Sequence, residues 1–136
     1  MTYMLDTNIL IYMMKADTGA FSNLKQKIAS IDLDQVCMSF ITYAELRFGA
    51  EASQNVAANK RKVDALARMV RVEYSVDKNL IKNYATVKAS LRKAGRPIGE
   101  NDLWIAAHAL AQDLILVSNN TKEFSLVEAL MLENWI

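Results

Sequence analysis

Short apolar runs recur along the chain, and each is followed by a segment whose apolar residues have helical spacing. The runs cover residues 3–5, 35–40, 71–74 and 114–117. Apolar residues then recur at intervals of three and four, which places them on one face of a helix. The clearest case is the series Leu80, Ile81, Tyr84, Val87 and Leu91. This alternation predicts an α/β fold with a mostly parallel sheet covered on both faces.

Length and composition narrow the possible functions. A chain of 136 residues is typical of one domain, here 1–136. With 16 basic and 15 acidic residues the net charge is +1, so a nucleic-acid contact would have to be local. The single cysteine, Cys37, excludes an intramolecular disulfide and a thiolate metal centre. No apolar stretch is long enough for a membrane span, and we expect a cytoplasmic protein.

Several residues indicate where the helices begin and end. We expect Thr7 or Asn8 to cap a helix over 9–14, because their side-chain oxygens accept from free backbone N–H groups. A polar break over 15–19 and a helix over 21–30 follow. Gly49 indicates a stop in the next helix. Gly95, with a proline two residues later, is typical of a helix end.

Three acidic side chains and one amide side chain lie at the ends of predicted strands or at the starts of predicted helices. Asp6 follows the first run, and Glu45 lies in the first helical turn after the second. Asp102 opens the helix 101–111, and Asn120 follows the run 114–117. Ligands of parallel α/β sheets bind at the carboxyl ends of the strands. Carboxylates about 4 Å apart repel by about 4 kcal/mol, so a cluster predicts protonation or a bound Mg²⁺.

Each of these carboxylates also has a purely structural explanation. Asp6 is in place to cap a helix, and Glu45 follows Thr42 at the spacing of a capping box. Asp102 is favoured in a first helical turn by the helix dipole. The spacing therefore leaves a metal site and structural carboxylates as open alternatives. His108, about 120° around the helix from Asp102, is expected to pack rather than act as a base.

Four motifs resemble those of the PIN-domain ribonucleases, and among these the VapC toxins of bacterial toxin–antitoxin pairs. The motifs are Asp6-Thr7-Asn8, the stretch 39–46, the block 95–109 around Asp102, and the stretch 117–124. The resemblance implies a PIN-like three-layer α/β/α fold with four to five strands. It also implies an endoribonuclease that hydrolyses RNA phosphodiesters, with tRNA as the expected substrate.

The resemblance also implies roles for individual residues. Asp6 and Asp102 would be the principal ligands of one or two Mg²⁺ or Mn²⁺ ions. Glu45 would be a further ligand or would orient the attacking water. Asn120 stands where many PIN domains have Asp, and because an amide carries no charge, a second metal would bind more weakly.

Other residues are expected around this site. Thr7, Asn8 and Ser118 would support the acids through hydrogen bonds. Arg96 and Lys122 lie close to the acids in the sequence, and we expect them to contact RNA phosphates.

The same resemblance implies partners. These are a cognate VapB antitoxin that inhibits the toxin, a second copy of the chain in a homodimer, and a toxin–antitoxin hetero-oligomer. Two alternatives remain. Asn120 is compatible with a catalytically weak PIN domain that acts as a binding module. A receiver-like phospho-switch would need paired acids after the first strand, where this chain has only Asp6.

Overall fold

The computed structural model describes residues 2–15 and 22–136. Its strands form one parallel sheet in the order β3-β2-β1-β4-β5. Their bounds are β1 (Tyr3–Leu5), β2 (Val36–Ser39), β3 (Arg71–Glu73), β4 (Ile115–Val117) and β5 (Leu132–Glu133). The predicted parallel sheet of four to five strands is therefore confirmed.

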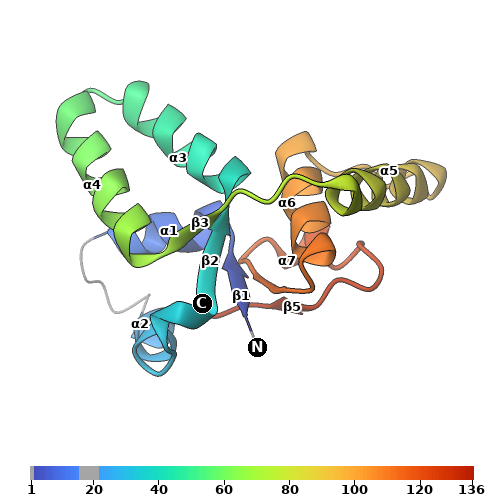
Figure 1. Cartoon of the computed structure of the whole chain (residues 1–136), viewed down its shortest axis with the longest axis horizontal. Coiled ribbons are helices and arrows are strands. Elements are labelled where there is room, and N and C mark those ends of the chain that lie inside the picture. Colours follow the sequence, from blue (N-terminus) through green and yellow to red (C-terminus); the bar gives the residue numbers. More distant parts are fainter. Residues whose placement is uncertain (1, 16–21) are drawn as a thin grey trace.

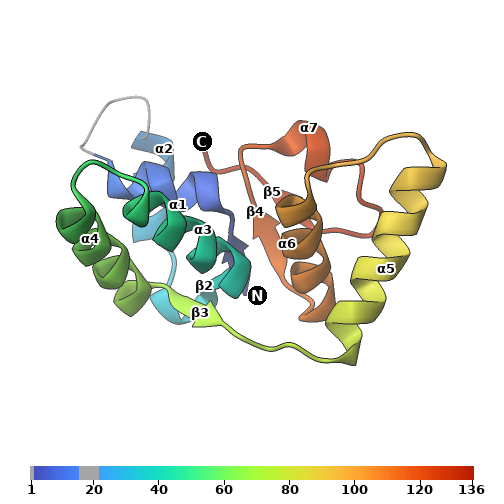
Figure 2. The ribbon, with the colours of Figure 1, turned by 90° about the horizontal axis from the view of Figure 1, so that it is seen from above.

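Helices cover both faces of this sheet (Figures 1 and 2). One layer holds α1 to α4, and α5 and α6 lie on the opposite face. The helices are α1 (Thr7–Met14), α2 (Ser22–Ala29), α3 (Phe40–Glu51), α4 (Val56–Met69), α5 (Lys78–Lys93), α6 (Glu100–Ala111) and α7 (Thr121–Phe124), with a 3-10 turn η2 (Leu33–Gln35). Of the predicted polar break over 15–19, all but Lys15 lies outside the described residues.

Neighbouring residues of each inner strand face opposite layers. Leu5 and Met38 pack in the cluster formed with α1 to α4, whereas Met4 and Cys37 pack in the cluster formed with α5 to α7. Because both faces are buried, the strands are apolar throughout rather than alternating. This is the three-layer α/β/α arrangement that the sequence predicts.

Strand register brings three chain segments together at one edge of the sheet. Leu5 of β1 lies beside Val117 of β4, and the Asp6 backbone N–H donates to the Val117 carbonyl at 2.9 Å. Asp6 and Ser118 therefore leave the sheet side by side. Ser39 ends the neighbouring strand β2. All three strands are parallel, so their carboxyl ends share this edge.

The helix boundaries correct several expectations. Asp6, not Thr7 or Asn8, caps α1, its carboxylate accepting the Thr7 backbone N–H. Ser39 caps α3, accepting from the Ile41 N–H at 3.1 Å, so Thr42 and Glu45 do not form a capping box. The expected stop at residue 49 is also wrong, because α3 continues to Glu51.

The end of α5 follows its sequence signal. Gly95 has φ +68°, a conformation that glycine adopts without steric cost. Its N–H donates to the Arg92 carbonyl, and the Arg96 N–H donates to Leu91 at 2.9 Å. These two hydrogen bonds close the helix and direct the loop toward α6. In the described parts of the chain, no helix has the length and apolar character needed to cross a bilayer.

Candidate active site

Asp6 is a buried carboxylate held by hydrogen bonds on both oxygens. Its side chain is 3% exposed. The Thr7 backbone N–H donates to Oδ1 at 2.8 Å, while the Ser118 hydroxyl donates to Oδ2 at 2.7 Å and the Asn8 amide at 3.2 Å. The structure therefore places Asn8 and Ser118 around Asp6, as the resemblance implies. These bonds fix the carboxylate at the sheet edge.

Thr7, the third of the expected supporting residues, forms a hydrogen bond with Glu45. The Thr7 hydroxyl lies 2.7 Å from Glu45 Oε1 and 3.2 Å from Thr42 Oγ1. A hydroxyl has one hydrogen, so Thr7 donates to the carboxylate and accepts from Thr42. Thr42 is fully buried in α3, which makes the chain of bonds rigid. Thr7 thereby ties the start of α1 to the α3 carboxylate.

Asp102 lies in the first turn of α6 and meets α7 through Asn120. The Asn120 amide donates to Asp102 Oδ2 and to Glu123 Oε2, both at 3.1 Å. Its backbone N–H donates to the Ser118 hydroxyl at 2.9 Å. Asn120 therefore bridges two carboxylates and connects them to the residue that holds Asp6.

Glu123 is an acidic member of this cluster that sequence reasoning missed. It is the third residue of α7 and shares the Asn120 amide with Asp102. The signal available was its spacing, three residues beyond Asn120, where a helix after the strand turns its first-turn side chains back toward the strand end.

The carboxylates of the cluster have no counter-ion among the residues that the structure describes. Burial raises the pKa of Asp6, against hydrogen bonds from Ser118 and Thr7 that lower it. Burial, a hydrogen bond with Glu123 and the charges of Asp6, Glu123 and Glu45 raise the pKa of Asp102 to about 7. Within residues 2–15 and 22–136, the ion pairs lie elsewhere, as between Lys88 and Glu100.

The donor chemistry fits a hard divalent cation. The converging side chains offer carboxylate, amide and hydroxyl oxygens, which Mg²⁺ and Mn²⁺ prefer, and their excess negative charge has no protein counter-ion among the described residues. As the side chains stand, no three of the described His, Cys, Asp or Glu residues form a ready-made metal cage. A cation here would therefore complete its shell with water, as Mg²⁺ commonly does.

The two expected phosphate contacts both lie at the surface. Arg96 is exposed on the loop between α5 and α6, and Lys122 is exposed in α7 next to Glu123. Neither forms an ion pair with the described acidic residues. Both cations therefore remain available to an anionic ligand.

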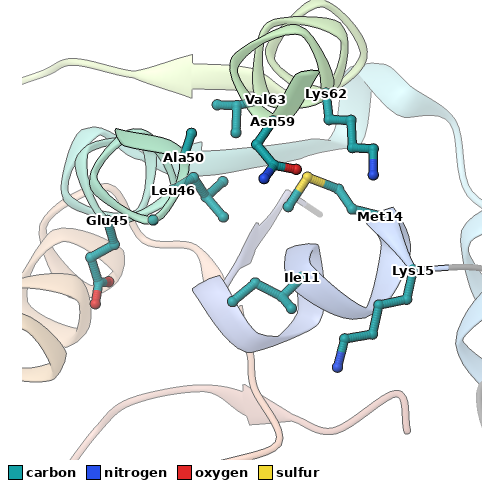
Figure 3. Close-up of a pocket in the computed structure, with 10 residues that line it drawn as sticks. Ile11, Met14, Lys15, Glu45, Leu46, Ala50, Asn59, Lys62 and Val63 are labelled. Carbon is teal, nitrogen blue, oxygen red and sulfur yellow. The ribbon is translucent and has the colours of Figure 1, made fainter. Parts of the chain in front are cut away.

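An apolar groove of about 280 Å³ runs between α1, α3 and α4 beside Glu45. Figure 3 shows Leu46 and Ala50 of α3 facing the α1 side chains, with Glu45 at one end of the groove. Lys15 and Lys62 stand at the other end. The groove thus joins an apolar floor to the acidic site.

Comparison with known proteins identifies the family. The family model described as "PIN domain" matches residues 3–130. The chain is 42% identical to Ribonuclease VapC1 of Haemophilus influenzae strain R2866, over 99% of this chain and 98% of that one. It is 33% identical to the tRNA(fMet)-specific endonuclease VapC of Shigella flexneri, covering 98% and 97% of the two chains.

A solved structure agrees with these relatives. In the VapBC-1 structure from nontypeable Haemophilus influenzae, one chain superposes with a TM-score of 0.88 at 40% identity, covering 99% of this chain and 98% of that one. The agreement extends over the whole sheet and both helical layers. This chain therefore belongs to the PIN-domain family and, within it, to the VapC ribonucleases.

Proposed function

We propose that this chain is a divalent-cation-dependent endoribonuclease that hydrolyses phosphodiester bonds in tRNA. The observation that carries the proposal is the convergence of Asp6, Glu45 and Asp102 at one sheet edge, where none of the described residues supplies a counter-ion. Support for a nuclease comes from the VapC relatives, and support for tRNA comes from the Shigella flexneri relative, named as a tRNA(fMet)-specific endonuclease. The membership in the PIN family leaves no ground for the receiver-like alternative.

In this proposal, Asp6 and Asp102 would hold a Mg²⁺ or Mn²⁺ ion. The bound cation would supply a Lewis acid that neutralises phosphate charge and makes water a better nucleophile. Glu45, oriented by Thr7, positions the attacking water. Asn120 donates a hydrogen bond to each of Asp102 and Glu123 without adding charge. Arg96 and Lys122 hold the phosphate backbone.

The first experiment is cleavage of purified total tRNA by the purified chain. Mg²⁺ or Mn²⁺ is supplied, and parallel reactions contain EDTA. Asp6→Asn preserves size and a helix-capping oxygen but removes the charge, so we expect it to abolish cleavage. Asp64→Asn, on the surface of α4 where Asp64 pairs with Arg47, is the matched control and should retain activity.

The outcomes separate the alternatives. Loss of cleavage in EDTA and in Asp6→Asn supports the proposed site. Cleavage that survives both would show that the site is wrong. A folded chain that binds tRNA but cleaves neither tRNA nor mRNA would favour the binding module.

We further propose that a VapB-type antitoxin inhibits the chain by covering the groove beside Glu45. The VapBC-1 complex supports a partner of this class. Ile11 lines the groove and is 39% exposed. Ile11→Asp should weaken inhibition by a co-purified antitoxin and leave cleavage intact. Met69→Asp, at an exposed position at the end of α4, is the control.

The proposed assembly is a homodimer within a toxin–antitoxin hetero-oligomer, in the cytoplasm. Large apolar side chains left exposed, such as Phe48 at 72% and Ile81 at 56%, support a further protein interface. The buried free thiol of Cys37 is compatible with a reducing compartment. Light scattering of the chain alone should give twice the monomer mass, and a monomer would contradict the dimer.

A further inference from the structure

A buried contact joins α3 to α6. His108 Nδ1 lies 2.8 Å from Ser39 Oγ, and both side chains are fully buried. Ser39 caps α3, and its Oγ also accepts the Ile41 backbone N–H. His108 lies in the last turn of α6. The pair therefore links the beginning of one helix to the end of the other.

This contact has a symmetrical relation to the site carboxylates. Glu45 lies six residues after Ser39, and Asp102 lies six residues before His108. At 1.5 Å per residue, each carboxylate is about 9 Å along its helix from the contact. The charge of Glu45 raises the pKa of Asp102, so the two carboxylates lie on the same side of the contact. Because Glu45 follows Ser39 in the chain whereas Asp102 precedes His108, the two helices are antiparallel. A change of spacing at the contact would therefore change the spacing of the carboxylates.

Counting hydrogen bonds indicates which ring nitrogen carries the proton. Burial lowers the pKa of His108, which keeps the ring neutral, and Nε2 has no partner among the described residues. A proton on Nδ1 would leave the Ser39 hydroxyl hydrogen unpaired as well as the Nε2 lone pair. A proton on Nε2 lets Ser39 donate to Nδ1 and leaves only Nε2–H unpaired. The second arrangement leaves fewer buried polar groups without a hydrogen-bond partner.

We propose that His108 is a positioning residue for RNA cleavage. Its Nε2-protonated ring accepts a hydrogen bond from the Ser39 hydroxyl and fixes α3 against α6, which sets the spacing of Glu45 and Asp102. The proposal rests on the proposed use of these two carboxylates in cleavage. Phe40 packs against the ring, with centroids 5.5 Å apart, and holds it in this orientation.

The tautomer can be tested without activity, because His108 is the only histidine. In the ¹⁵N-labelled full chain, long-range proton–nitrogen NMR spectra should show one ring with a protonated Nε2 and an unprotonated, hydrogen-bonded Nδ1. The Ser39→Ala variant should shift the Nδ1 resonance. A ring protonated on Nδ1, or a mixture of tautomers as in free histidine, would overturn the proposal.

The steady-state kinetics of tRNA cleavage test the positioning role. His108→Phe keeps a ring of similar volume but removes the acceptor, whereas His108→Asn retains an acceptor close to the Nδ1 position. We expect His108→Phe and Ser39→Ala each to lower kcat about tenfold with little change in KM, since small misplacements of catalytic groups are costly. The double variant should be no slower than the slower single variant, and His108→Asn should recover most of kcat.

A matched control separates positioning from general loss of stability. Asn55→Ala removes the side-chain cap of α4, a helix that carries none of the site carboxylates, and should leave kcat unchanged. Equal kcat in wild type and His108→Phe, or an equal loss in His108→Asn and His108→Phe, would overturn the positioning role. If the wild type does not cleave RNA at all, the proposed function fails, while the NMR result still decides the Ser39–His108 bond.

Discussion

The Asn120 amide donates to Asp102 Oδ2 at 3.1 Å and to Glu123 Oε2 at the same distance, so one neutral side chain bridges two carboxylates. A hydrogen-bond donor at position 120 reduces the repulsion between Asp102 and Glu123, whereas a carboxylate there would increase it. The residue therefore sets how strongly the cluster depends on a bound cation.

Asn120→Asp should make the fold more dependent on divalent cations. The new charge lies close to Asp102 and Glu123, and because the position is half-buried, we expect a loss of about 1–2 kcal/mol of unfolding free energy in EDTA at pH 8. Mg²⁺ should restore more stability to this variant than to the wild type. Urea unfolding with and without Mg²⁺ measures both quantities. Equal stability of the two proteins in EDTA would contradict the bridging role.

Asp102→Asn should stabilise the fold at high pH while abolishing cleavage. Folding raises the pKa of Asp102 to about 7, mainly through burial, whereas the unfolded chain releases this proton near pH 4. Between these values the folded state binds more protons, so the free energy of unfolding falls as the pH rises. Asp102→Asn has no carboxyl group at this position, so its free energy of unfolding does not fall for this reason. In EDTA it should match the wild type near pH 4 and exceed its stability at pH 8.

Urea unfolding at pH 4, 6 and 8 tests this dependence, with the wild type and Asp102→Asn compared at each pH. Carboxylates that do not interact with Asp102 cancel in the difference. One of these is Glu73, which accepts hydrogen bonds from Ser75 and Arg71 that lower its pKa to about 2. A difference that stays constant with pH would rule out a strongly raised pKa for Asp102.

The layers and the inner strands follow from the sequence because they depend on continuous apolar runs and helical periodicity. The edge strand β5 does not, because Leu132–Glu133 is too short to show a period. It forms because β4 offers free backbone groups: the Leu116 N–H donates to Met131 and the Ser118 N–H to Glu133. Tertiary pairing, rather than local sequence, creates this strand.

The site was predictable where residues lie directly at strand ends, as with Asp6. It was not predictable where a helix boundary decides the geometry. Placing the cap of α3 at Ser39 rather than Thr42 frees Thr42 to bond Thr7 and turns Glu45 toward the site. Glu123 was missed because the four residues of α7 give no periodic signal.

Thr7→Val should slow cleavage without unfolding the chain. The variant keeps the side-chain volume but loses the hydroxyl that donates to Glu45 at 2.7 Å. We expect a cost of about 1 kcal/mol in stability and at least a tenfold drop in kcat, because Glu45 is no longer oriented. Thr7→Ser, which keeps the donor, should stay close to wild type. Similar rates for Thr7→Val and Thr7→Ser would show that Glu45 needs no such support.

Arg96→Ala and Lys122→Ala should reduce the salt dependence of RNA binding. Each phosphate contact contributes about 0.7 to 0.9 to the slope of log affinity against log salt concentration, because a bound cation displaces counterions. Binding is measured in the Asp102→Asn background, where RNA stays intact. Lys82→Ala, an exposed position near the opposite end of α5 from Arg96, is the control and should leave the slope unchanged. Loss of affinity in all three variants to the same extent would indicate a general charge effect rather than phosphate contacts beside the acidic site.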